Sequence, residues 1–462
     1  MPKPIKKSVG LGPEQTEHSN RQTTRVGSLR QNVMQVAIDA LILNPKNARK
    51  HSDEQIRRLE SCIRTHGFLV PLLIDDSRNV VLGHGRLLAA RKAGMTEVPT
   101  LIVSGLTATQ VRTFAIAENR LSDLASWDND MLRLEMRDLL DLEVNIEDTA
   151  FSTGKVDILL DGAGHQGSAD DDVVPALAPG EPVTRKGDLW LLGPHRLMCG
   201  DATNAADYER LLENLKANVV FTDPPYNVPI DGHVGGLGKI KHREFAMASG
   251  EMSSEQFTRF LTTVFALLAR HSRRGSIHFI CMDWRHLREV LAAGHEVYSD
   301  FKNLCVWNKD NAGMGSLYRS KHELVLVFQN GAGRFQNNVS LGATGRYRTN
   351  VWDYPGINTL RNGRMDELAM HPTVKPLALV ADAIRDCSRR NDLILDPFAG
   401  SGTTILAARR TGRVAAAMEI DPGYVDVAIQ RWENATNTPA TLVGSAETFV
   451  DVRAARLGKP DA

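Results

Sequence analysis

Polar and apolar positions in the first quarter of the chain predict a small α+β unit. After Ser52, the apolar residues Ile56, Leu59 and Ile63 recur at helical spacing, and Gly67 ends the pattern. Ser52 and Gln55 have the spacing of a capping box, which marks the start of a helix. The other predicted elements are the strands Val70–Ile74 and Val80–Leu82, the helix Leu87–Ala93, the strand Val98–Val103 and a helix opened by Thr107. We assign this α+β domain to residues 31–125.

A second helical stripe follows and then fades into polar sequence. Leu134 and Leu139 belong to this stripe, whereas residues 162–168 are rich in Gly and polar side chains. Residues 135–172 carry eleven acidic side chains against two basic ones. Such a charge run is typical of solvated spacer sequence. We therefore predict one helix and an acidic flexible linker over residues 126–182.

Between residues 183 and 445 short apolar runs alternate with amphipathic helices. Val219–Phe221, Leu393–Leu395 and Val414–Ile420 each have the length of a buried strand. Ile405–Arg410 is predicted as a helix that ends at Gly412, a natural C-terminal glycine. Buried strands alternating with helices predict an α/β domain, with a mostly parallel sheet and helices on both faces.

Composition limits the classes of protein that fit this pattern. The 462 residues leave room for two or three domains, and the net charge of zero provides no overall field for a polyanion. Five cysteines without a C-x-x-C pair fit a reducing cytosol and no structural metal. No apolar run reaches the ~20 residues of a membrane span, and the Lys-rich start lacks the apolar core of a secretion signal. We expect a cytoplasmic protein with a disordered arm over 1–30 and a tail over 446–462.

Candidate chemistry stands directly behind the apolar run Val219–Phe221. The next residues are Asp223, Pro224, Pro225 and Tyr226. A carboxylate and the Pro224 carbonyl could accept both N–H groups of a planar exocyclic amine, whose lone pair is otherwise delocalised into a ring. Tyr226 could stack on a base turned out of its helix. The alternative is an ordinary turn, because Asp and Pro both favour turns.

A glycine-rich turn follows the second apolar run. Residues 396–404 read Asp-Pro-Phe-Ala-Gly-Ser-Gly-Thr-Thr and lead into the predicted helix, whose free N–H groups can approach a ligand closely. Glu419 stands at the end of the next strand, where α/β folds bind ribose hydroxyls. The G-x-G-x-x-G pattern is incomplete, which favours an adenosine ligand without a pyrophosphate over a nicotinamide dinucleotide.

In this order the motifs resemble those of β-class DNA amino-methyltransferases. The tetrapeptide at 223–226 comes first, His371-Pro-Thr-Val-Lys-Pro376 follows, and the 396–402 loop comes last, whereas RNA and protein-glutamine methylases usually place the glycine loop first. The resemblance implies a Rossmann-like fold, S-adenosyl-L-methionine as methyl donor, no metal, and double-stranded DNA as substrate. The catalytic residues that it implies are Asp223, Pro224, Pro225 and Tyr226. The donor-binding residues that it implies are Asp201, Thr373, Lys375, Asp396, Phe398, Gly400, Gly402, Thr403 and Glu419.

Some of these residues have structural alternatives. Asp201 is also typical of a turn, and Lys375 could cap the helix that begins at Pro376. Asp421, which precedes Pro422 and a helical stripe, favours an N-cap over a ligand role.

The base that accepts the methyl group is also open to more than one interpretation. Adenine N6 is favoured because Asp heads the tetrapeptide, whereas cytosine-N4 relatives more often have Ser there. Cytosine N4 is the first alternative. A DNA-binding regulator with an inactive methylase half is the second. The resemblance leaves open a cognate restriction enzyme as partner, and either a monomer or a homodimer.

The N-terminal unit resembles the ParB/sulfiredoxin-like domain, from Asn44-Pro45 through Glu118-Asn119-Arg120. Its Gly83-His84-Gly85-Arg86 takes the place of that family's phosphate-binding turn. The resemblance implies that Gly83, Gly85 and Arg86 bind a phosphate, with a nucleotide or DNA as ligand. Partition proteins usually carry paired arginines here, whereas this chain has His84 and one arginine. His84 is either a base or a group that hydrogen-bonds at the helix start.

Two segments of the α/β domain carry cations near the predicted site. Residues 227–250 hold Lys239 and Lys241 directly after the tetrapeptide. Residues 331–370 interleave arginines with aromatic side chains, where β-class enzymes carry a target-recognition segment. The side chains for which we predict DNA contacts are Lys239, Lys241, Arg334, Arg346 and Arg348.

Overall fold

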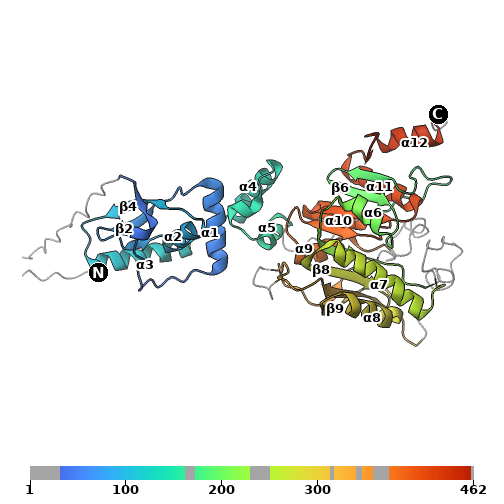
Figure 1. Cartoon of the computed structure of the whole chain (residues 1–462), viewed down its shortest axis with the longest axis horizontal. Coiled ribbons are helices and arrows are strands. Elements are labelled where there is room, and N and C mark those ends of the chain that lie inside the picture. Colours follow the sequence, from blue (N-terminus) through green and yellow to red (C-terminus); the bar gives the residue numbers. More distant parts are fainter. Residues whose placement is uncertain are drawn as a thin grey trace, which may run out of the picture. The chain divides into compact units, whose positions relative to one another are not determined.

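The structure is a computed structural model that describes residues 32–161, 172–228, 250–312, 317–339, 346–356 and 374–458. Its contacts divide the chain into two units (Figure 1). The first comprises Met1–Asp128 with Asp148–Ala150, and the second comprises Asn129–Glu147 with Phe151–Ala462.

The first unit is a four-stranded sheet with three helices. The sheet order is β1-β4-β2-β3, and only β2 and β4 pair in parallel among its described strands. The elements are β1 (Met34–Ala37), α1 (Asp53–His66), β2 (Leu72–Asp75), β3 (Val80–Leu82), α2 (His84–Lys92), β4 (Glu97–Val103) and α3 (Ala108–Leu124). Ser52 caps α1 and Thr107 forms a complete capping box on α3, as the sequence predicts. The core is made by apolar residues such as Leu72, Ile74 and Leu87.

Residues 129–161 contain more regular structure than the sequence predicts. The elements are α4 (Asn129–Asp141), the 3₁₀ turn η2 (Ile146–Thr149) and α5 (Thr153–Asp161). Met136, Ile146 and Val156 are buried together, one from each element. The prediction of a single helix and a tether misses α5, because its nine residues lie inside the acidic run and its charge masks its apolar face.

The second unit is built on a ten-stranded mixed sheet, drawn from green to red in Figure 1. Its order is β11-β9-β10-β8-β7-β12-β13-β6-β5-β14. The parallel pairs are β11–β9, β8–β7, β7–β12, β12–β13 and β13–β6. The strands are β5 (Leu189–Leu192), β6 (His195–Cys199), β7 (Ala217–Thr222), β8 (Ser272–Met282), β9 (Asp300–Asn308), β10 (His322–Gln329), β11 (Val351–Asp353), β12 (Leu393–Asp396), β13 (Val414–Glu419) and β14 (Thr441–Leu442).

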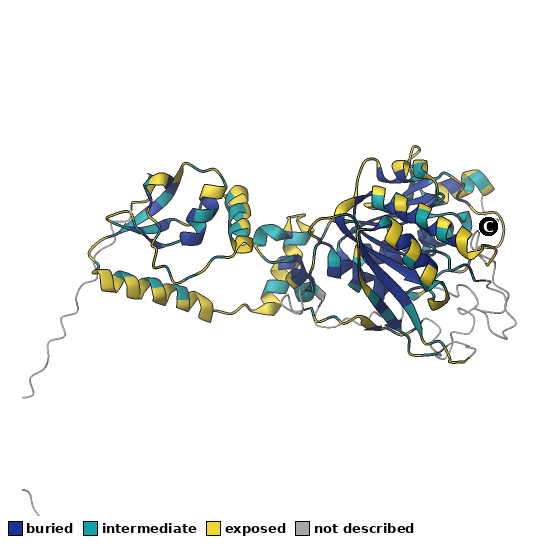
Figure 2. Ribbon diagram, turned by 60° about the horizontal axis from the view of Figure 1, so that its bottom comes forward, coloured by how far each residue is buried: buried dark blue, intermediate teal, exposed yellow. Residues whose placement is uncertain are grey.

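Helices cover both faces of this sheet, as predicted. In β7, Val219 and Phe221 belong to one apolar cluster, whereas Val220, between them, belongs to the other. Alternate residues of one strand therefore face opposite layers, and Figure 2 shows the strands as buried. The first cluster includes residues of α9 (Leu377–Cys387), α10 (Thr403–Thr411), α11 (Pro422–Thr436) and α12 (Phe449–Leu457). The second includes residues of α6 (Ala205–Leu212), α7 (Ser254–Arg270) and α8 (Leu287–Val297).

The predicted tail over 446–462 contains α12. Phe449 is buried, and its ring lies 5.5 Å from that of Trp190 in an edge-on arrangement. This part of the tail therefore belongs to the core of the second unit. In the described part of the chain, no helix is long and apolar enough to cross a membrane.

Candidate active site

Three strand ends bring the predicted motifs to one edge of the sheet. β7, β12 and β13 are consecutive and parallel, so that their carboxyl ends lie side by side. Asp223 follows β7, Asp396 ends β12 and Glu419 ends β13. Ligands of α/β sheets bind at this kind of edge.

A cleft opens at this edge. Its empty volume, open solvent at its mouth included, is about 1260 Å³. The predicted site residues that line it are Asp223, Pro224, Pro225, Tyr226, Lys375, Asp396, Phe398, Gly400, Thr403 and Glu419. The structure therefore brings these residues, which are distant in the chain, into one cleft.

The side chains of Asp223 and Tyr226 form the polar end of the cleft together with Lys375. The Tyr226 hydroxyl donates to Asp223 Oδ1 at 2.6 Å, and Lys375 Nζ donates to Asp223 Oδ2 at 2.5 Å. Lys375 Nζ also donates to the Tyr226 hydroxyl at 3.1 Å. Lys375 is 6% exposed and Asp223 is 23% exposed. Lys375 therefore contacts the 223–226 tetrapeptide directly, beyond its predicted place beside the donor.

Glu323, the second residue of β10, completes this cluster. One carboxylate oxygen accepts from the Tyr226 hydroxyl at 3.2 Å and lies 3.0 Å from Lys375 Nζ. The other oxygen pairs with Lys309, whose Nζ lies 4.4 Å from the centre of the Trp307 ring. Two carboxylates thus face two ammonium groups. No local pattern assigns Glu323 a role, although an acidic residue at the start of an otherwise apolar strand is a usable signal.

Burial and charge set the ionisation of this cluster. Burial raises the pKa of Asp223, while the Lys375 ammonium opposes that rise. Burial would also raise the pKa of Glu323, but Lys375 and Lys309 lower it to about 2. The pKa of Lys375 is raised, because Asp223 and Glu323 outweigh its burial. Burial raises the pKa of Tyr226 well above its ordinary value, so its hydroxyl stays a donor.

Asp396 joins the strands to the glycine-rich turn. Its Oδ1 accepts from the Thr222 hydroxyl at 2.9 Å and from the Phe398 backbone N–H at 3.1 Å. Its Oδ2 accepts from the Thr404 hydroxyl at 2.6 Å. Burial raises the pKa of Asp396 to about 6. Through these bonds Asp396 holds β7, the glycine-rich turn and the start of α10 together at the cleft.

Glu419 is held by the backbone around it. One oxygen accepts from the Gly400 N–H at 2.9 Å, and the other accepts from the Asp421 N–H at 3.0 Å. Each carboxylate oxygen can accept a second donor. Burial raises the pKa of Glu419 to about 7. The arrangement suits a ligand that brings hydroxyl donors.

The glycine-rich turn is shaped by a close helix approach. Gly402 has a φ of 81°, and a Cβ there would lie 3.0 Å from the Ala428 Cβ of α11. Gly402 does not itself appear in the cleft wall. Thr403 accepts from Arg431 Nη1 at 2.9 Å, and the Phe398 ring lies 6.2 Å from that of Phe260.

Three other residues of the sequence analysis have separate outcomes. Asp201 is not among the described residues of the cleft wall; its Oδ1 accepts from the Thr203 N–H at 2.8 Å and the Thr203 hydroxyl at 2.7 Å, as in the turn alternative. Asp421 caps α11 by accepting from the Gly423 N–H, which confirms the N-cap prediction, and it also lines the cleft. Thr373 lies outside the described residues.

The predicted DNA contacts of Arg346 and Arg348 do not match their positions. Arg346 pairs with Asp386 at 2.7 Å and Arg348 pairs with the same carboxylate at 3.1 Å. Their side chains are 11% and 18% exposed. Both guanidinium groups bind Asp386 of α9 and so hold their segment against that helix. We therefore no longer assign a DNA contact to either arginine. Arg334 is exposed, and Lys239 and Lys241 lie outside the described residues.

In the first unit, Gly83, Gly85 and Arg86 line a separate pocket with His51 and His84. Gly83 caps α2 with a φ of 99°. His84 Nε2 is buried without a hydrogen-bond partner in the structure. Arg86 Nη1 donates to the Val70 carbonyl at 2.8 Å and the Pro71 carbonyl at 3.2 Å. Arg49 and Arg86 make the pocket basic. Arg86 also stabilises the fold through its two hydrogen bonds to backbone carbonyls.

Comparison with known proteins places three family matches along the chain. Residues 217–430 match the family described as DNA methylase, residues 22–120 match the ParB N-terminal domain, and residues 130–186 match the ParB-methyltransferase HTH domain.

In the described part of the chain, no cluster of three or more His, Cys, Asp or Glu side chains could hold a metal ion.

Similar proteins and structures each cover about half of the chain. The DNA adenine methyltransferase YhdJ of Escherichia coli (strain K12) is 26% identical over 266 residues, which is 52% of this chain and 82% of YhdJ. The type II methyltransferase M.HpaI of Haemophilus parainfluenzae is 24% identical over 263 residues, which is 52% of this chain and 75% of that protein. The crystal structure of the M1.HpyAVI–SAM complex is 22% identical, with a TM-score of 0.38, and the match covers 51% of this chain and 97% of that structure.

The matched segments coincide with the structural features described above. The DNA methylase match contains all three strand ends of the cleft, and the ParB match contains the Gly83 turn. The chain therefore joins a DNA amino-methyltransferase domain of the N6/N4 family to a ParB N-terminal domain and a ParB-methyltransferase HTH domain.

Proposed function

We propose that this chain transfers a methyl group from S-adenosyl-L-methionine to the exocyclic N6 of adenine in double-stranded DNA. One observation carries the proposal: an amine-accepting corner and a wall suited to an adenosyl ligand belong to the same cleft. Asp223, Pro224 and Tyr226 form the corner, and Phe398 and Glu419 belong to the wall.

The wall fits the donor on its own chemistry. Glu419 offers two carboxylate oxygens, each with one backbone donor, so each can still accept a ribose hydroxyl. Phe398, Val380 and Ile420 supply apolar surface for the ring system. When bound, the donor supplies an electrophilic sulfonium methyl group.

For an amine to bind here, Asp223 must give up one of the hydrogen bonds that it now accepts. Tyr226 and Lys375 each donate to a different oxygen of Asp223. An entering amine would take one of these positions, while the Pro224 carbonyl accepts its second N–H. This polarises the amine and orients its lone pair toward the methyl group. Transfer forms a C–N bond and breaks the S–C bond. Asp223 can take the proton that the amine releases, because burial makes it more basic than an exposed aspartate.

Adenine is proposed over cytosine on two grounds. Asp223 heads the tetrapeptide, as it more often does in enzymes that act on adenine N6. The relative YhdJ is named a DNA adenine methyltransferase. Cytosine N4 stays the alternative, since its amine would meet the same acceptors.

The test is transfer of tritium from labelled S-adenosylmethionine to duplex DNA. We expect transfer by the wild-type chain, and loss of at least about 10³-fold for Asp223→Ala, because the amine loses its acceptor in a low-dielectric site. Asp300→Ala is a matched control, since Asp300 is 52% exposed on β9. A wild-type chain that binds DNA but transfers nothing would establish the DNA-binding regulator instead.

We also propose that the pocket of the ParB N-terminal domain binds a nucleotide. The supporting observation is the buried, unpartnered His84 Nε2 at the start of α2, beside Arg49 and His51 in the same pocket. Isothermal titration calorimetry with the four nucleoside triphosphates should give heat for the wild type and at least about tenfold weaker binding for Arg86→Ala. Arg86→Lys, which keeps the charge, is the control; no heat with any nucleotide would refute this proposal.

A further inference from the structure

Two acidic residues outside the matched methylase segment hold the two ends of α9. Asp157, from α5, lies at the C-terminal end of α9, and Asp172 lies at its N-terminal end. Both precede residue 217, where the DNA methylase match begins, and both lie within the ParB-methyltransferase HTH match. α9 begins two residues after Lys375, the cation that contacts Asp223.

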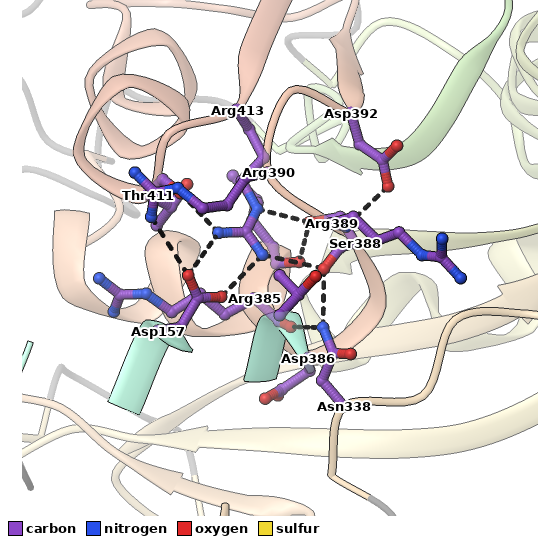
Figure 3. Close-up of polar contacts among 12 residues, drawn as sticks. Asp157, Asn338, Arg385, Asp386, Ser388, Arg389, Arg390, Asp392, Thr411 and Arg413 are labelled. Atoms are coloured by element: carbon purple, nitrogen blue, oxygen red, sulfur yellow. Dashed lines mark hydrogen bonds and ion pairs between the residues drawn. The ribbon is translucent and has the colours of Figure 1, made fainter. Parts of the chain in front are cut away.

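The C-terminal end of α9 is fixed through a buried charge pair (Figure 3). Asp157 accepts from Arg413 Nη1 at 3.1 Å and from Arg413 Nη2 at 2.8 Å, and it pairs with Arg390 at 3.3 Å. Asp157 and Arg413 are 1% and 0% exposed. Arg413 also donates to the Ser388 hydroxyl at 3.0 Å and to the Ser388 carbonyl at 2.9 Å. Ser388 is the C-cap of α9, so one guanidinium joins α5 to the end of α9.

The N-terminal end of α9 lacks a cap of its own. Pro376 occupies the N-cap position and its side chain makes no capping bond. Asp172 Oδ1 accepts from the Leu377 N–H at 2.8 Å and supplies the missing acceptor from another segment. The backbone that carries Lys375 enters the helix at this point.

α5 has no exposed face that could enter a groove of DNA. In a helix-turn-helix the second helix enters the major groove, and α5 is the second helix described within residues 130–186. Between Thr153 and Leu160 only Lys155 is exposed. Residues 129–161 carry nine acidic and three basic side chains, a balance that repels phosphates.

We propose that Asp157 and Asp172 are positioning residues: they bracket α9 and so fix Lys375 beside Asp223, and α5 serves this bracket instead of reading DNA. The inference rests on the proposed methyl transfer for its catalytic part. Its structural part stands on the buried contacts alone.

The catalytic part is tested in the full-length chain with Asp172→Ala. Without the cap acceptor, kcat for tritium transfer should fall about 5- to 20-fold, while KM for DNA stays within about twofold. The acid limb of the pH profile should move to higher pH, because a displaced Lys375 no longer opposes the raised pKa of Asp223. Asp172→Asn keeps an acceptor oxygen and should restore the wild-type rate. Asp138→Ala removes an exposed acid from α4 and is the matched control.

The structural part is tested with Asp157→Asn and Lys155→Ala. Loss of the buried charge beside Arg413 should lower the Tm of the second unit by roughly 5–15 °C. Lys155→Ala should leave the Kd for DNA within about twofold at fixed salt.

Each part has its own contrary outcome. A wild-type kcat and pH profile for Asp172→Ala would refute the positioning role. Tenfold weaker DNA binding by Lys155→Ala, with an unchanged Tm for Asp157→Asn, would make α5 a DNA reader. If the wild type transfers no methyl group, the proposed function fails. The Tm of Asp157→Asn still tests whether Asp157 holds the C-terminal end of α9.

Discussion

The two glycine turns of this chain share a backbone conformation and differ in what surrounds them. Gly402 and Gly83 both have left-handed φ angles, of 81° and 99°, and both cap a helix. A Cβ on either would meet a neighbour, at 3.0 Å from Ala428 and at 2.5 Å from Leu72. In each turn, glycine therefore lets the start of a helix pack closely against a neighbouring element.

The charges around the two turns are opposite. The Gly402 turn belongs to a cleft with the acids Asp223, Asp396 and Glu419 and the cation Lys375, whereas the pocket at Gly83 contains Arg49 and Arg86 with one acid, Glu118. Carboxylates accept from hydroxyl and amine donors, whereas guanidinium groups bind anions. The comparison teaches that a glycine turn shows where a ligand can approach, and that neighbouring side chains decide which ligand it is.

The largest effect is expected from Lys375→Met in the acidic cleft. It leaves Asp223 and Glu323 with less compensating charge in a buried site, and should destabilise the second unit by about 3–5 kcal/mol. Any remaining activity should need a higher pH, because the pKa of Asp223 would rise further without Lys375. Thermal melting and the pH dependence of kcat measure both effects. Lys302→Met breaks an exposed pair and is the control; equal melting of the two variants would contradict the account.

The next effect concerns donor binding. Glu419→Gln keeps the shape of the side chain and removes its charge, so affinity for S-adenosylmethionine should fall about 10- to 100-fold, as for loss of charge-assisted hydrogen bonds. Calorimetry measures this, and the same variant should bind a nucleotide at the Gly83 turn unchanged. Unaltered donor affinity would remove Glu419 from the site.

Donor affinity should also depend on pH. The pKa of Glu419 is raised to about 7 by burial, and ribose hydroxyls bind its ionised form. Binding should therefore tighten by up to about tenfold between pH 6 and pH 8. The stability of the ligand-free protein should change in the opposite sense, falling by up to about 3 kcal/mol as pH rises from 4.5 through 7, since the folded state favours the protonated carboxyl. Glu419→Gln should flatten both curves; a pH-independent donor affinity in the wild type would rule out this role for Glu419.

The smallest effect is expected at the other turn. A Cβ at Gly85 would lie 3.0 Å from His51 Nδ1 and 3.2 Å from Leu59 Cδ1, which narrows the pocket. Gly85→Ala should weaken nucleotide binding by about tenfold, or 1.4 kcal/mol, without changing donor binding. A nucleotide affinity equal to that of wild type would place the ligand elsewhere.

Residues that stand at strand ends were predictable from the sequence. Asp223, Asp396 and Glu419 each follow an apolar run, and parallel strands end at one edge. The caps Ser52 and Thr107 were predictable too, because their partners are three residues away.

Contacts between distant segments were not predictable. Glu323 reaches Tyr226 across 97 residues, through a strand pairing that no local pattern encodes. Arg346 and Arg348 have the composition of a DNA contact until folding brings Asp386 to them. Asp157 belongs to an acidic run that is typical of solvated sequence, and only the fold sets it against Arg413.

The central claim is that the Asp223 corner methylates an exocyclic amine of DNA. The direct measurement is mass analysis of nucleosides from duplex DNA that has been incubated with S-adenosylmethionine and either the wild-type chain or Asp223→Ala. The account predicts N6-methyladenine with the wild type and none with the variant. N4-methylcytosine would overturn the choice of adenine, and the absence of any methylated nucleoside would contradict the claim itself.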